Sequence, residues 1–92
     1  MPPETQVAVV TGAARRIGAC IAATLARRGT AVVVNYRTSV TDAEATVAAI
    51  RAAGGRAVAV AADVSCAADV DRLFDATLAA FGRVDLLVNN AS

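Results

Sequence analysis

The feature that most constrains this chain is an apolar run that leads through a glycine-containing loop into a helical pattern, between Val7 and Gly18. Val7–Val10 is apolar on both faces, as in a parallel strand that helices cover on both sides. Gly12 permits a tight turn after it, and Gly18 lets the following helix pack close to the strand. Free backbone N–H groups at the start of that helix favour an anion. The stretch therefore predicts a pyrophosphate site, although such loops also occur in α/β proteins without one.

Apolar strands and helical patterns alternate along the rest of the chain. Strands are predicted at Val7–Val10, Ala31–Asn35, Ala57–Ala62 and Val84–Val88. Apolar stripes at helical spacing lie between them, formed in chain order by Ile17, Ile21 and Leu25, by Val47 and Ile50, and by Val70, Leu73, Phe74, Thr77, Leu78 and Phe81. This alternation predicts an α/β fold, a Rossmann-type doubly wound parallel sheet in partial form (β-α-β-α-β-α-β) with strand order 3-2-1-4.

Local signals also predict where the helices begin and where a ligand binds. Thr41 and Glu44 fit a capping box at the start of the second helix, and Ser65 is expected to cap the third. In such a sheet, ligands bind at the carboxyl ends of the strands, beside the point where the strand order reverses. The reversal falls here between the first and fourth strands.

The loop resembles the signature of a known family. The order Thr-Gly, then Ile-Gly, over residues 11–18 resembles the N-terminal motif Thr-Gly-x-x-x-Gly-x-Gly of the short-chain dehydrogenase/reductase family. Arg16 stands where that family usually has its middle glycine. The pteridine reductases are a similar subgroup, because they carry a basic pair at the positions of Arg15 and Arg16. The resemblance implies a dinucleotide-dependent oxidoreductase with a carbonyl or pterin-like substrate.

Two further stretches resemble the same family. Asp63-Val64 is similar to the pair that follows its third strand, where the carboxylate accepts from the adenine amino group; Asp63 could instead only favour the adjacent helix N-terminus. Asn89-Asn90-Ala91-Ser92 resembles the Asn-Asn-Ala-Gly motif that ends the fourth strand. The resemblance implies that Asn90 and Ala91 lie along the cofactor ribose. Ser92 replaces the usual glycine, as in the pteridine reductases.

The end of the second strand indicates which dinucleotide binds. NAD sites usually place a carboxylate about 20 residues beyond the glycines, for the ribose 2′-OH. Tyr36 occupies that position, and no carboxylate occurs in Ala31–Thr41. Arg37, Ser39 and Arg15 could instead bind a 2′-phosphate, so NADP(H) is favoured over the alternative that Arg37 is only a solvated loop residue. The residues expected at the cofactor are Gly12, Arg15, Arg16, Ile17, Gly18, Tyr36, Arg37, Ser39, Asp63, Val64, Asn90, Ala91 and Ser92.

The 92 residues contain no lysine and a single tyrosine, Tyr36. The family requires a tyrosine as proton donor and a lysine four residues later. We therefore expect residues 1–92 to be the N-terminal part of a dinucleotide-binding domain that lacks the catalytic half and catalyses nothing alone. The alternative is a stand-alone nucleotide-binding or interaction module, or a degenerate remnant.

Composition excludes several other classes of function. A net charge of +1 gives no long-range attraction to nucleic acid, and no apolar run is long enough to cross a bilayer. The N-terminus lacks a signal-peptide pattern, so a cytoplasmic location is expected. The chain contains no histidine, and its two cysteines, Cys20 and Cys66, lack metal-ligand spacing, so both are expected to be small buried residues.

The predicted topology also has a consequence for assembly. The first two helices are expected on one face of the sheet, so only the helix between the third and fourth strands covers the other face. The fourth strand also presents an edge without a hydrogen-bonding partner strand. We therefore expect the chain on its own to self-associate, to aggregate or to need the missing half as a partner, and the complete form to be a homo-oligomer.

Overall fold

A parallel sheet of four strands forms the centre of the fold. The computed structural model describes residues 2–90. The strands are β1 (Val7–Val10), β2 (Ala31–Tyr36), β3 (Ala57–Ala61) and β4 (Leu86–Val88). The helices are α1 (Arg16–Arg27), α2 (Val40–Ala52) and α3 (Ala67–Phe81). The strand order is β3-β2-β1-β4, which confirms the predicted Rossmann-type order.

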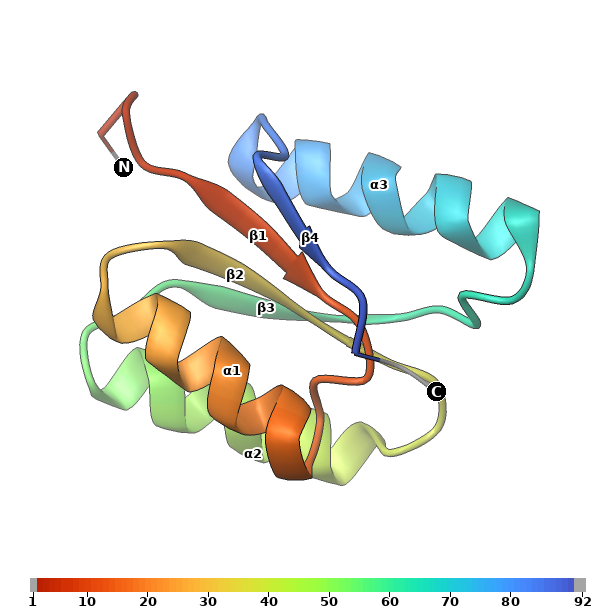
Figure 1. The fold of residues 1–92 in the computed structure, drawn as a ribbon, viewed down its shortest axis with the longest axis horizontal. Helices are drawn as coiled ribbons and strands as arrows, with labels where there is room; N and C mark the ends of the chain where they lie inside the picture. The colour runs from red at the N-terminus through yellow and green to blue at the C-terminus, as the bar shows by residue number, and fades with distance from the viewer. Residues whose placement is uncertain (1, 91–92) are drawn as a thin grey trace.

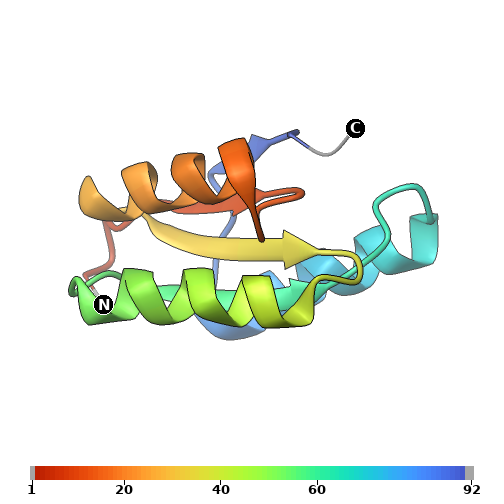
Figure 2. The same ribbon diagram turned by 90° about the horizontal axis from the view of Figure 1, so that it is seen from below.

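The helices cover the two faces of the sheet unequally (Figure 1). α1 and α2 lie side by side on one face, and α3 lies alone on the other (Figure 2). This follows from right-handed crossovers, because the chain moves outward from β1 to β3 and then returns past β1 to reach β4. Among the helices of residues 2–90, none combines the length and the apolar character that crossing a bilayer requires.

Residues of the central strands point alternately to the two faces. Val32 and Val34 of β2 pack against α1 and α2, whereas Val33 packs with Val9 and Leu73 on the side of α3. These four valines are fully buried, and Leu73 is 1% exposed. Burial on both faces explains why the strands are continuous apolar runs in the sequence.

α1 packs on the sheet through its smallest residues. The buried residues of this helix are Gly18, Ala22 and Ala26. They follow one another at four-residue spacing and so share one face. Of the apolar stripe seen in the sequence, Ile17 is 70% exposed, and Ile21 and Leu25 are only partly buried at the edge of the core. The row of small residues brings the helix close to the strands and leaves these bulky side chains beside the contact.

α2 begins two residues earlier than the predicted capping box implies. Its first residue is Val40, so Ser39 occupies the cap position and Thr41 lies inside the first turn. The capping box predicted from Thr41 is therefore wrong. The predicted inward residues are confirmed, since Val47 and Ile50 are 6% and 4% exposed. Packing of these residues against the sheet sets the helix, and Ser39 makes no side-chain capping bond.

α3 is not capped by Ser65. The Ser65 hydroxyl and backbone N–H both donate to Asp63 Oδ1, at 2.6 and 3.0 Å. Cys66 takes the cap position instead, without a side-chain bond. Of the predicted stripe, Leu73 and Thr77 are fully buried.

The cysteines are not buried, contrary to the prediction. Cys20 lies two residues after Gly18, and a step of about 200° around the helix turns it away from the sheet. Cys66 lies in the exposed turn before α3.

β4 is shorter than predicted and incompletely covered. It contains three residues rather than the five of Val84–Val88, because pairing with β1 begins at Leu86. Leu86 and Leu87 are 45% and 51% exposed. On α3, Leu78 is 49% exposed. Apolar surface is therefore open on both faces of β4 and beside it.

A carboxylate joins the start of β4 to the start of β1. Asp85 Oδ2 accepts from the backbone N–H of Val7 at 2.8 Å, and the backbone N–H of Asp85 donates to the Val7 carbonyl at 2.8 Å. Arg83 donates to Asp85 Oδ1 at 2.6 Å and to the Pro3 carbonyl at 2.8 Å. The hydrogen bond from Arg83, and to a lesser extent the one from the Val7 backbone, holds the pKa of Asp85 below its ordinary value of 3.8.

Because folding lowers this pKa, ionised Asp85 stabilises the fold above pH 3.8, and the stabilisation is lost as the pH falls towards the lower, folded pKa. We expect Asp85→Asn to lower the Tm at pH 7 and to flatten the fall in Tm between about pH 5 and pH 3. Asp71→Asn, at an exposed carboxylate of α3, is the matched control. Parallel Tm profiles for the native chain and Asp85→Asn, measured by circular dichroism, would contradict this role.

Candidate functional site

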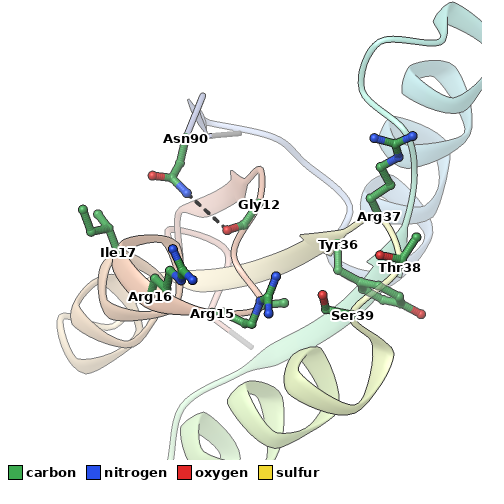
Figure 3. Close-up of a pocket in the computed structure, with 10 residues that line it drawn as sticks. Gly12, Arg15, Arg16, Ile17, Tyr36, Arg37, Thr38, Ser39 and Asn90 are labelled. Atoms are coloured by element: carbon green, nitrogen blue, oxygen red, sulfur yellow. Dashed lines mark hydrogen bonds between the residues drawn. The ribbon is translucent and has the colours of Figure 1, made fainter. Parts of the chain in front are cut away.

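A cavity of about 530 Å³ opens at the carboxyl ends of β1 and β2, beside the reversal in strand order. Figure 3 shows Arg15, Arg16 and Ile17 on one side of it and Tyr36, Thr38 and Ser39 on the other. The lining residues are Gly12, Ala14, Arg15, Arg16, Ile17, Tyr36, Arg37, Thr38, Ser39 and Asn90. Segments that follow three different strands thus meet at one place, as predicted from the topology.

The loop that borders this cavity can exist only because Gly18 has no side chain. A Cβ at Gly18 would overlap the Gly12 carbonyl oxygen and stand 2.7 Å from Asn90 Nδ2. Gly12 itself has a φ of +61°, in the region that favours glycine. Close approach at Gly18 brings the start of α1 against the loop, where the first N–H groups of the helix have no partner within it. This arrangement suits a bound anion.

Two asparagines hold the first half of the loop. Asn35 Oδ1 accepts from the Gly12 N–H at 3.3 Å, and Asn35 Nδ2 donates to the carbonyls of Val60 and Ala62. Asn90 Nδ2 donates to the Gly12 carbonyl at 3.2 Å, a bond drawn in Figure 3. The loop is therefore tied to β2, to β3 and its following residue, and to the end of β4 at once.

Arg16 adopts a backbone conformation that glycine would adopt more easily. Its φ is +58°, the only positive value among the non-glycine residues that the structure describes. This is the position of the usual middle glycine in the resemblance drawn from the sequence. The chain thus keeps the loop geometry and accepts backbone strain in order to place a guanidinium at the cavity.

The cavity has a strongly cationic lining. Arg15, Arg16 and Arg37 contribute to it, whereas no aspartate or glutamate among residues 2–90 does. Arg15 Nε lies 3.6 Å from Asp42 Oδ2, and Arg37 Nε lies 3.9 Å from Asp63 Oδ2. Both pairs are half or more exposed on the arginine side, so they contribute little to stability. The lining suits a phosphate group.

A second cavity of about 510 Å³ lies on the side of α3. Asp63, Val64 and Phe74 help to line it, together with Leu87. The two hydrogen bonds from Ser65, and more weakly Arg37, hold the pKa of Asp63 below its ordinary value. Asp63 is therefore an ionised hydrogen-bond acceptor beside an apolar wall.

The structure brings together most of the residues predicted for the site. Eight of them line the first cavity, namely Gly12, Arg15, Arg16, Ile17, Tyr36, Arg37, Ser39 and Asn90. Asp63 and Val64 line the second, and Gly18 lies beneath the loop. Ala91 and Ser92 lie outside the described residues. The cofactor contacts predicted for all of these residues stay predictions.

Sequence reasoning missed three residues that shape the loop. Asn35 is 2% exposed, and its signal is a lone amide at the end of an apolar strand. Thr46 donates to the Ala14 carbonyl at 2.8 Å, and Asp42 contacts Arg15. Asp42 and Thr46 are four residues apart on α2, and this spacing is visible in the sequence. Their partners, Arg15 and Ala14, lie more than 25 residues away along the chain.

Comparison with known proteins identifies the family. A model described as short chain dehydrogenase matches residues 6–92. The chain belongs to the short-chain dehydrogenase family. An uncharacterized oxidoreductase of Methylorubrum extorquens is 57% identical over 88 residues, which are 96% of this chain and 36% of that protein. A 3-oxoacyl-acyl-carrier-protein reductase of Synechocystis sp. is 56% identical over 86 residues, 94% of this chain and 35% of that one.

Solved structures of short-chain dehydrogenases have the same fold. A metagenomic short-chain oxidoreductase in complex with NADP is 47% identical and superposes with a TM-score of 0.87, over 95% of this chain and 39% of that one. The chain thus spans about a third of the length of the relatives that it matches.

The strain at Arg16 can be measured. A left-handed backbone conformation raises the free energy of a residue that carries a side chain by about 1–2 kcal/mol. Glycine removes this strain, but part of the gain in stability is lost because glycine gives the unfolded chain more conformational entropy. We expect Arg16→Gly to raise the free energy of unfolding by about 0.5–1 kcal/mol. Arg16→Ala keeps the strain while removing the charge, and should give no gain. Equal effects of the two substitutions in urea unfolding would show that Arg16 is unstrained.

Proposed function

We propose that residues 1–92 are the N-terminal, NADP(H)-binding part of a dinucleotide-binding domain in a short-chain dehydrogenase/reductase. The observation that carries this proposal is the cavity beside the glycine loop, which three arginines and no described carboxylate line. The NADP complex of the related metagenomic oxidoreductase supports the same choice of cofactor.

The glycine loop would bind the pyrophosphate. Gly12 and Gly18 let the backbone approach closely, and the start of α1 supplies unpaired N–H groups and a partial positive charge. A Cβ at Gly18 would overlap the Gly12 carbonyl oxygen, so the helix can meet the loop this closely only with glycine there. The donor set of the loop therefore fits the diphosphate.

The ribose 2′-phosphate would lie between the loop and the end of β2. Arg15 from the loop and Arg37 with Ser39 from the segment after β2 supply cationic and hydroxyl donors there. Tyr36 stands where NAD-specific relatives would place a carboxylate, so the 2′-phosphate meets no opposing charge from that position. In Figure 3, Arg15 extends from the loop, whereas Arg37 starts at the end of β2 and extends away from Arg15, with its Nε 3.9 Å from Asp63 Oδ2.

The remaining predicted residues would contact the two ends of the cofactor. Ionised Asp63 accepts from the adenine amino group, with Val64 against the ring. Asn90, Ala91 and Ser92 would lie along the ribose at the nicotinamide end. When bound, the dinucleotide supplies a hydride for reduction of a carbonyl or pterin-like substrate in the complete enzyme. The basic pair Arg15 and Arg16 supports the likeness to the pteridine reductases and a flat, polar substrate.

A second candidate function is that of a non-catalytic nucleotide-binding or interaction module. It is favoured by one observation: the 92 residues hold no lysine, and their only tyrosine lies at the adenosine end of the cavity. They therefore lack the family's proton donor. An in-frame downstream segment with Tyr-x-x-x-Lys would establish the enzyme and exclude the module. A cytoplasmic location and a homo-oligomeric complete form stay predictions.

Cofactor choice is tested by isothermal titration calorimetry. We expect NADPH to bind at least about tenfold more tightly than NADH, because each charge-assisted bond to the 2′-phosphate contributes about 1.5–3 kcal/mol. Arg37→Asp should lose most of this preference. Arg56→Asp makes the same charge change at the start of β3, at the opposite end of the sheet, and should keep the preference. Equal affinities for NADPH and NADH in the unsubstituted chain would refute the proposal.

We also propose that the 92-residue chain self-associates through the exposed apolar surface of β4 and α3. Leu86 and Leu87 expose it on the two faces of β4, and Leu78 exposes it on α3. Replacing Leu86 and Leu87 together with threonine, which keeps strand propensity, should reduce association in sedimentation velocity. A monodisperse monomer without substitution, with a cooperative thermal transition and no binding of an apolar dye, would contradict this.

A further inference from the structure

One face of α2 holds the second half of the glycine loop. Thr46 Oγ1 donates to the Ala14 carbonyl at 2.8 Å, and Asp42, one helical turn earlier, faces Arg15 at 3.6 Å. Residues four apart lie above one another on a helix. Both contacts therefore come from a single helical face.

That face is fixed rigidly to the core. Ala43, next to Asp42, is fully buried, and Val47, next to Thr46, is 6% exposed. Ala14 is also buried, at 7%. The carboxylate of Asp42 is thus carried by a packed helix, while Arg15 belongs to a loop and has a side chain that is 59% exposed.

The edge of the guanidinium that Asp42 faces matters for binding. The ion pair joins Asp42 Oδ2 to Arg15 Nε. An arginine whose Nε is occupied still has the two terminal nitrogens, which form the fork that binds a phosphate through two parallel bonds. No hydrogen bond from those nitrogens to any of residues 2–90 is found. Arg15 can therefore keep Asp42 and take a phosphate at the same time.

The same carboxylate could act in the opposite way, by repelling a phosphate. Two observations favour positioning. Asp42 does not line the cavity, although Arg15 does. Its ion pair with Arg15 is made through Nε, at 3.6 Å. Arg15 therefore stands between the carboxylate and the cavity.

We propose that Asp42 is a positioning residue that determines cofactor specificity by holding Arg15 with its terminal nitrogens towards the 2′-phosphate. The inference rests on the proposed function, because it requires NADP(H) at this cavity. Thr46 holds the loop backbone, which meets the pyrophosphate common to both dinucleotides. The two residues of one helical face thus act on different parts of the ligand.

The test measures NADPH and NADH affinities by calorimetry at one ionic strength, on the product of the complete reading frame. We expect Asp42→Ala to weaken NADPH about fivefold while NADH changes less than about twofold. Asp42→Asn should lose NADPH affinity nearly as much as Asp42→Ala, because the 3.6 Å contact is an ion pair that needs the charge of the carboxylate. Thr46→Val should weaken both dinucleotides equally.

Glu44→Ala is the matched control, since it removes one exposed negative charge from the same helix and should leave the ratio of the two affinities unchanged. If Asp42→Ala binds NADPH as tightly as the unsubstituted protein, or more tightly, the proposed role of Asp42 is wrong. The proposed function would be unaffected by that result. Loss of both dinucleotides to the same extent in Asp42→Ala would also overturn the proposed role of Asp42. Failure of the unsubstituted protein to bind either dinucleotide would overturn the proposed function and this inference with it.

Discussion

The contact that the rest of the site depends on is the approach of α1 to the glycine loop at Gly18. A single Cβ there would collide with the Gly12 carbonyl oxygen and with Asn90. Because this space is empty, the start of α1, the loop after β1 and the end of β4 meet within hydrogen-bonding distance. The same approach explains why α1 packs through glycine and alanine, since larger residues on that face would hold the helix away from the sheet.

Electrostatics then decides what this frame can bind. The loop supplies N–H groups that suit any dinucleotide, whereas the arginines around the cavity are proposed to favour one with an additional phosphate. Arg16 adds a positive charge at a position whose backbone conformation favours glycine. The short-chain dehydrogenase model matches residues 6–92, so the loop and the arginines both lie within the matched part of the chain.

The sequence predicted the fold order correctly because strand–helix alternation leaves few topologies open. It also predicted Gly12, Gly18 and the arginines as neighbours, since motif spacing and topology together place them at one sheet edge. It failed at the helix caps, where packing overrides local preference: Ser65 bonds to Asp63 instead of to a helix. It could not predict that Asp42 and Thr46 touch the loop, because this depends on how α2 lies against α1.

The most direct measurement of the central claim compares 2′-phospho-ADP-ribose with ADP-ribose by calorimetry. These ligands share adenine, pyrophosphate and both riboses, and differ only in the 2′-phosphate that the arginines are proposed to bind. The account predicts tighter binding of 2′-phospho-ADP-ribose by at least about tenfold, with a difference that shrinks as the salt concentration rises. Equal affinities at low salt would contradict it.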